Sequence, residues 1–196
     1  MDKTRDKMQA QNRHAIRMGV GALCCALAAP LAQAGPAEDN ALAEKEFARG
    51  DLIASIALWK KAAEAGYAPA QARYGDLLDK SEEDEEAVEW YRKAAAQGNA
   101  HGEYGLGQMY GKGEGVPKDR AQALSHTLRA AQLNYVPAVT LMMEAYRAGG
   151  MGLAPNAAEA DAWEAKLMAL VPTYQKYTPK VKPAPKGKGA AKKDTP

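Results

Sequence analysis

A short motif recurs along this 196-residue chain at nearly constant spacing. It reads LWKKAA at residues 58–63, WYRKAA at residues 90–95 and HTLRAA at residues 126–131, so successive copies begin 32 and 36 residues apart. One repeat of this length cannot bury its apolar face alone and is stabilised by stacking on neighbouring copies. The period therefore predicts an array of stacked structural units.

The residues between the copies predict two helices in each unit. Gly66, Gly98 and Asn134 share one repeat position, which ends a helix, and the two glycines can supply the left-handed residue there. Pro69 and Pro137 share another position, in the first turn of the next helix, where a missing N–H costs little. Composition agrees, because alanine dominates the apolar residues and favours helices over sheets.

Three polar residues are predicted to be helix N-caps. Asp119, Asn156 and Ser81 each precede, by three residues, a side chain that can complete a capping box. The predicted fold class is all-α, an α/α solenoid of about four antiparallel helix pairs. The expected helices span residues 39–49, 51–65, 68–79, 83–97, 100–111, 119–133, 136–148 and 156–170.

The repeated positions resemble the Sel-one-like repeat family, whose units are similar to tetratricopeptide repeats. The best match comprises Ala87, Trp90, Tyr91, Lys93, Ala94, Ala95, Gly98, the segment from Gly102 to Tyr110, Gly113, Gly115, Val116 and Asp119. The resemblance covers residues 41–170 and implies tandem helix pairs. Two departures from the family pattern are Met143, in place of a helix-contact glycine, and a missing glycine–valine loop after Leu78.

The N-terminus is predicted to be an export signal. Lys and Arg side chains occur in residues 1–17, residues 18–29 are apolar, and residues 32–34 (AQA) form a small-residue cleavage site before Gly35. Such an apolar core spans about 18 Å as a helix, against about 30 Å of hydrocarbon in a bilayer. We therefore predict a cleaved signal peptide over residues 1–34, a periplasmic or secreted mature chain, and no other contact with the membrane.

Charge is segregated along the chain. Residues 35–175 hold 14 Lys and Arg against 21 Asp and Glu, a net charge of −7, whereas residues 176–196 hold 7 Lys and one Asp, a net charge of +6. We expect the first segment to be the repeat domain and the Lys-, Pro- and Ala-rich tail to be disordered. The tail either binds anionic envelope components or only solubilises the chain and rests on its acidic body.

No convergent set of catalytic or cofactor-binding residues is found in the predicted mature chain. The glycine run at residues 105–115 fits neither nucleotide-binding template. Cys24 and Cys25 lie in the predicted signal, which leaves no thiolate for a zinc site or a nucleophile. His101 is expected at an exposed helix start, and His126 as a ring packed between helices. The prediction is therefore a protein that is not an enzyme, with no cofactor, metal or nucleic-acid site.

An acidic run at residues 82–86 is predicted to form the first turn of a helix that Ser81 caps. There its carboxylates would face the positive end of the helix dipole. A calcium loop beginning at Asp79 is disfavoured, because Asp84 stands at its glycine position and Trp90 at its glutamate position.

The candidate partner-binding surface consists of polar positions on the first helices of successive units. Its members are Asp76, Gln108 and Glu144, which share one repeat position, and Ala72, Tyr104 and Thr140, one turn earlier. First helices line the concave face of a stacked array, and a groove with a tyrosine and polar groups suits an extended peptide or a helix of a partner. An ordinary solvated surface is the alternative.

Together these features predict a non-catalytic periplasmic scaffold or adaptor that binds another protein through its concave face. One alternative is a cell-envelope protein that binds or hydrolyses peptidoglycan. Another is binding of anionic components through the basic tail, which high salt would weaken.

Overall fold

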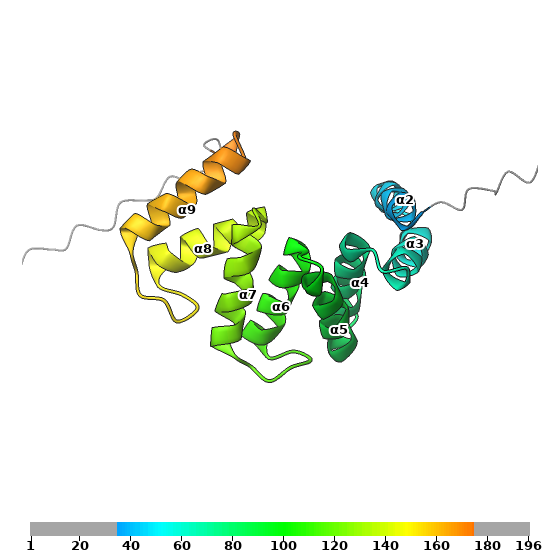
Figure 1. Cartoon of the computed structure of the whole chain (residues 1–196), viewed down its shortest axis with the longest axis horizontal. Coiled ribbons are helices and arrows are strands. Elements are labelled where there is room, and N and C mark those ends of the chain that lie inside the picture. The colour runs from blue at the N-terminus through cyan, green and yellow to red at the C-terminus, as the bar shows by residue number, and fades with distance from the viewer. Residues whose placement is uncertain (1–34, 175–196) are drawn as a thin grey trace, which may run out of the picture. The chain divides into compact units, whose positions relative to one another are not determined.

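The computed structural model describes residues 35–174, and this part of the chain contains eight helices and no strand (Figure 1). The helices are α2 (Pro36–Arg49), α3 (Leu52–Glu64), α4 (Ala68–Lys80), α5 (Asp84–Ala96), α6 (Ala100–Lys112), α7 (Arg120–Gln132), α8 (Val136–Ala148) and α9 (Ala157–Leu170). The all-α solenoid prediction is confirmed, and the predicted helix ends differ from the observed ones by at most three residues. The predicted signal and tail lie outside the described residues.

The chain divides into two compact units, Met1–Ala65 and Gly66–Pro196. The described part of the first unit is the pair α2 and α3. In the second unit α4 packs on α5, α6 on α7, and α8 on α9, while α5 contacts α6 and α7 contacts α8, so that successive pairs stack (Figure 1). None of the helices in residues 35–174 combines the length and the hydropathy needed to cross a bilayer.

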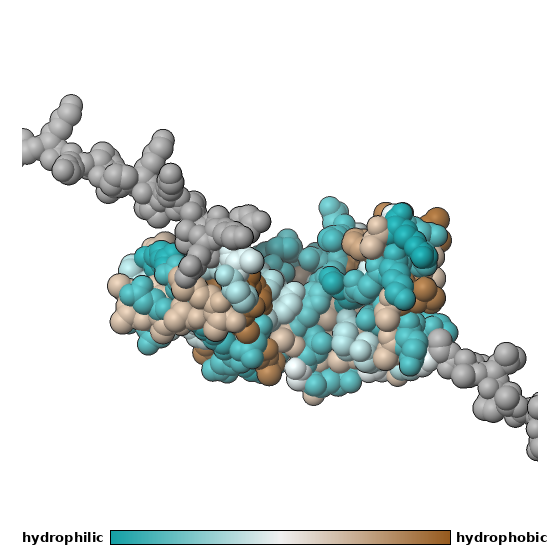
Figure 2. Space-filling view, turned by 90° about the horizontal axis from the view of Figure 1, so that it is seen from above, coloured by the Kyte–Doolittle hydropathy of each residue, from teal (hydrophilic) through white to brown (hydrophobic). Residues whose placement is uncertain are grey.

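In the first unit, contacts that join α2 and α3 include an ion pair and an aromatic contact. The Lys61 ammonium lies 2.8 Å from the carboxylate of Asp39, a residue that is only 5 % exposed. The Phe47 and Trp59 rings lie 5.4 Å apart. The surface nevertheless retains large apolar side chains, among them Ile53 at 85 % exposure, and Figure 2 shows brown surface over these helices.

Short-range turn chemistry explains where most helices begin and end. The Asp119 carboxylate accepts hydrogen bonds from the first-turn amides of α7, and the Asn156 side chain does the same for α9, as predicted. The prediction that Ser81 is an N-cap is wrong. Ser81 ends α4, and its hydroxyl donates to the Leu77 carbonyl at 3.0 Å, while α5 begins after Glu83 without a side-chain cap.

Removing the N-cap of α7 should have a measurable cost. Asp119→Ala is expected to lower the free energy of unfolding by about 1 kcal/mol, because first-turn amides lose their acceptor. Ser81→Ala is the matched control and should change it by less than about 0.5 kcal/mol, since it removes no N-cap. Urea denaturation followed by circular dichroism measures both. Equal losses in the two variants would contradict the cap assignment.

Tyr91 of α5 packs between α4 and α6 in the second unit. It is 1 % exposed, and its ring packs against two glycines, Gly75 of α4 and Gly105 of α6. A Cβ atom added at Gly75 would lie 2.8 Å from the ring, and one at Gly105 would lie closer still. The missing side chains therefore create the space that the aromatic ring fills between the two helices.

A second core joins α7, α8 and α9. Its members are Ala130, Ala131, Ala138, Val139, Met142, Met143 and Leu167. Met143, which departs from the family pattern, is 3 % exposed and fills this core. In addition, the Lys166 ammonium of α9 donates to the Ala131 carbonyl at 2.7 Å, close to the end of α7. The last helix pair is thus held both by apolar packing and by a polar contact.

Candidate functional site

The six residues predicted to bind a partner lie on α4, α6 and α8, but they differ in accessibility. Gln108 and Glu144 are exposed, and Asp76, Tyr104 and Thr140 are half-buried. Ala72 is 0 % exposed and cannot contact a partner, so its inclusion was wrong. It was predicted to be on the concave face because it lies one turn before Asp76, whereas helix packing covers its small side chain. The role of the other five residues stays a prediction.

Asp76 is the centre of a hydrogen-bond network across three helices. Its Oδ1 atom accepts a bond of 2.9 Å from the Tyr91 hydroxyl of α5 and lies 3.0 Å from Nε2 of His101 on α6. The Arg73 guanidinium lies 3.8 Å from Oδ2. Burial, together with the adjacent Asp76 charge, raises the pKa of the Tyr91 hydroxyl far above its ordinary value, so the phenol remains a donor. The network therefore connects the core to the surface.

Three aromatic side chains continue from this network along the surface. The His101 ring stacks on Tyr135, with centroids 5.3 Å apart, and Tyr135 in turn contacts Tyr104, also at 5.3 Å. All three are half-buried, so each has one covered and one accessible part. We call His101, Tyr104 and Tyr135 the aromatic strip. It runs from the first turn of α6 to the residue before α8.

Sequence reasoning missed two members of the aromatic strip. His101 was expected at an exposed helix start, but its side chain is only 18 % exposed, because Asp76 and Tyr135 cover it. Tyr135 was not considered. A usable signal was present, since Tyr67 occupies the same repeat position as Tyr135, next to the residue that ends the preceding helix.

The two tyrosines of the strip are neutral hydrogen-bonding groups. Burial raises the pKa of Tyr104 above its usual value, the hydrogen bond with Gln108 opposes this increase, and the Glu144 charge adds to it. Burial likewise raises the pKa of Tyr135, with the Asp76 charge acting in the same direction and Arg73 in the opposite one. Both phenols therefore stay protonated at neutral pH and combine an apolar ring with a polar tip.

A second polar network lies between α6 and α7. Glu103 is 6 % exposed, its Oε2 atom lies 2.7 Å from Nδ1 of His126, and its Oε1 atom lies 3.5 Å from Arg129. The His126 ring stacks on Tyr110 with an interplanar angle of 4°. The prediction that His126 packs between helices is confirmed. Since both carboxylate oxygens have partners, this network joins the two helices of a pair.

Three carboxylates meet beside the first turn of α5. Ligand atoms of Asp79, Asp84 and Glu114 all lie within 4.8 Å of one another. The Lys112 ammonium lies 2.7 Å from Glu114 and 3.7 Å from Asp79, so it supplies positive charge to the cluster. Burial raises the pKa of Asp79, and Lys112 opposes the increase. Asp84, Glu85 and Glu86 lie in the first turn of α5 as predicted, whereas Glu82 and Glu83 of the acidic run precede the helix. Glu114 was not predicted to lie beside Asp84.

Comparison with known families identifies the repeat. The Sel1 repeat model matches residues 47–67, 68–99 and 100–135. A curated relative, an uncharacterized protein of Neisseria meningitidis serogroup B, is 33 % identical over 123 residues, which are 45 % of this chain and 26 % of that protein. The chain thus spans about a quarter of this relative's length.

Two crystal structures resemble the fold. A Sel1 repeat protein from Oxalobacter formigenes is 26 % identical, with a TM-score of 0.61 over 70 % of this chain and 59 % of that one. A protective antigen of uropathogenic Escherichia coli strains, with an SLR fold, is 28 % identical, with a TM-score of 0.57 over 74 % of this chain and 34 % of that one. Sel1 repeats generally serve as protein-binding scaffolds. Residues 47–135 therefore consist of three tandem Sel1 repeats, and the paired helices agree with the fold of these two structures.

Proposed function

We propose that this protein is a non-catalytic scaffold that binds one protein partner through the aromatic strip and the polar residues beside it. The observation that carries the proposal is the continuous contact of His101, Tyr135 and Tyr104, each partly accessible, across successive helix pairs. Tyrosine rings with accessible hydroxyls are enriched among the residues that dominate protein interfaces. Gln108 and Glu144 add polar groups next to Tyr104.

The arrangement favours an extended segment or a single helix as the bound element. Asp76 and Arg73 lie at one end of the aromatic strip, and Gln108 and Glu144 lie near the other. An apolar middle with polar ends matches a segment that buries one or two apolar side chains and pairs its flanking groups with the protein. Because Asp76 and Tyr91 hold His101 in place, this end of the strip is ordered before binding, which lowers the entropic cost of association.

Site-specific photocrosslinking tests this proposal in the native cells. p-Benzoylphenylalanine in place of Tyr104 should give one discrete adduct with a partner protein, whereas the same group in place of Glu85, exposed on α5, should give none. With the captured partner purified, Tyr104→Ser is expected to raise Kd about tenfold or more, and Glu85→Ser to leave it within about twofold. Identical adducts from both positions would refute a role for the strip.

We also propose that the protein acts in the periplasm. Support comes from the sequence alone: the basic residues before position 18, the apolar stretch at residues 18–29 and the small residues at 32–34. The intact mass of the protein recovered from a periplasmic fraction should correspond to a chain that starts at Gly35. A full-length chain confined to the cytoplasm would contradict this location.

A further inference from the structure

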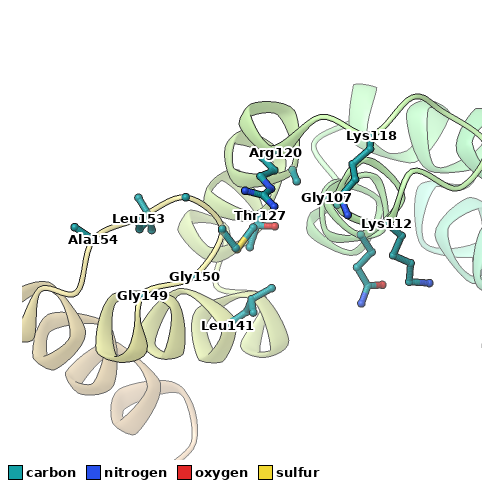
Figure 3. Close-up of a pocket in the computed structure, with 15 residues that line it drawn as sticks. Gly107, Lys112, Lys118, Arg120, Thr127, Leu141, Gly149, Gly150, Leu153 and Ala154 are labelled. Atoms are coloured by element: carbon teal, nitrogen blue, oxygen red, sulfur yellow. The ribbon is translucent and has the colours of Figure 1, made fainter.

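The second unit contains a pocket that no residue of the aromatic strip lines. Its volume is about 870 Å³, within the range of about 300–1,000 Å³ that is typical of small-molecule sites. The walls come from the C-terminal half of α6, the beginning of α7, one side of α8 and the loop between α8 and α9 (Figure 3). Gln108 lines the pocket and also contacts Tyr104, so the two surfaces adjoin.

All charged side chains that line the pocket are positive. They are Lys112, Lys118 and Arg120, whereas the whole segment of residues 35–174 carries a net charge of −7. Lys112 is paired with Glu114, but Lys118 and Arg120 form no ion pair with a carboxylate among residues 35–174. A concave site lined by charge of one sign concentrates ligands of the opposite charge. Within this acidic segment, the pocket is therefore a place where an anion would be concentrated.

Apolar side chains and the backbone of several glycines form much of the remaining lining. Leu141, Leu153 and Met151 contribute side chains, and Figure 3 shows Leu153 beside the loop glycines, with Arg120 extending toward Thr127. Met151 adopts a φ of 53°, which is uncommon for a residue with a side chain. Strained backbone of this kind persists where surrounding structure enforces it and is concentrated at functional sites.

From this geometry we infer that the pocket binds a small organic anion. Its carboxylate, sulfonate or phosphate group pairs with Lys118 and Arg120, and its apolar part packs on Leu141, Met151 and Leu153. A guanidinium and an ammonium form charge-assisted hydrogen bonds with such a group. This binding requires no protein partner at the aromatic strip.

Two fluorescent probes that differ in one charged group test the inference on the full chain. The first is 8-anilinonaphthalene-1-sulfonate, and the second is N-phenyl-1-naphthylamine, which has the same rings without the sulfonate. The sulfonate probe should bind one saturable site more tightly than the neutral probe. Inorganic phosphate, an anion without an apolar part, should displace it only at much higher concentration. Equal affinity for both probes, or for phosphate and the sulfonate probe, would overturn the inference.

Matched variants locate the binding site. Lys118→Gln with Arg120→Gln should weaken binding of the sulfonate probe about tenfold or more, whereas Lys60→Gln with Lys80→Gln removes the same charge from exposed positions elsewhere and should change it by less than about twofold. Gly111→Leu should also weaken binding of the sulfonate probe. A Cβ atom at Gly111, which lines the pocket, would meet only Ala123, at 3.7 Å, so the helix can accept the leucine and its side chain would occupy the pocket.

Exposed apolar side chains in the first unit provide the competing explanation for probe binding. Ile53→Ser removes the most exposed of them and should leave the affinity unchanged. If Ile53→Ser abolished binding while the pocket variants retained it, the probe would be bound on the first unit and the inference would be wrong. Equal weakening by the Lys118–Arg120 pair and the Lys60–Lys80 pair would show that net charge alone attracts the probe, which would also overturn the inference.

Discussion

Tyr91→Ala is expected to lower the free energy of unfolding by about 3–5 kcal/mol, the usual cost of removing a fully buried aromatic ring. The ring fills the space between Gly75 and Gly105, and glycine offers no side chain that could move into the cavity. The substitution also removes the hydroxyl that donates to Asp76. Domains are typically stable by about 5–15 kcal/mol, so the variant should lose a large part of its stability.

Tyr91→Phe is the control that separates ring packing from the hydrogen bond. It keeps the ring and removes only the donor to Asp76, which His101 still contacts, so a loss of about 1–2 kcal/mol is expected. Urea denaturation followed by circular dichroism gives both values. If alanine and phenylalanine at position 91 had the same effect, the ring would not carry the packing energy described above.

The second large effect is expected at Gly102, in the first turn of α6. A Cβ atom at this position would lie 2.6 Å from Cβ of Ala94, 2.9 Å from N of Ala95 and 3.0 Å from O of Tyr91. Two of these atoms belong to the backbone of α5 and cannot rotate away. Gly102→Ala is therefore expected to destabilise the protein by about 1–3 kcal/mol, although alanine is favoured over glycine inside a helix by about 1 kcal/mol.

Gly111→Ala in the same helix should have the opposite sign. There the added Cβ would meet only Cβ of Ala123, at 3.7 Å, an ordinary contact. The variant is expected to gain about 0.5–1 kcal/mol, because alanine loses less backbone entropy on folding. Thermal or urea unfolding of the two variants provides the test. Stabilisation by both alanines would contradict the close approach of α5 and α6 at Gly102.

The positions of the helices could be predicted from the sequence because the signals that set them are local. The repeat period gives the number of helices, and Asp119 and Asn156 cap the helices that follow them. Ser81 shows where this reasoning stops. Its side chain can serve either end of a helix, and the short turn before α5 brings it to the end of α4 instead. A polar residue between two nearby helices does not reveal which of them it caps.

The proposed binding surfaces were harder to predict, because they depend on contacts between repeats. Tyr104 was identified from its repeat position, but its contact with Tyr135 requires the packing of α6 against the start of α8. The pocket combines Lys118 and Arg120 with a loop more than 28 residues further along the chain. The repeat period places residues within one repeat, whereas the spacing and rotation between neighbouring repeats decide which side chains contact one another.

The carboxylate of Asp76 limits how the proposed binding surface can change during evolution. One oxygen of this group serves both a core phenol and a surface imidazole, so a substitution there would disturb the interior as well as the exterior. Tyr104, Gln108 and Glu144 have no such link to Tyr91. The proposed binding surface can therefore change at the exposed Gln108 and Glu144 without disturbing Tyr91, whereas the end at Asp76 is constrained by the packing that supports it.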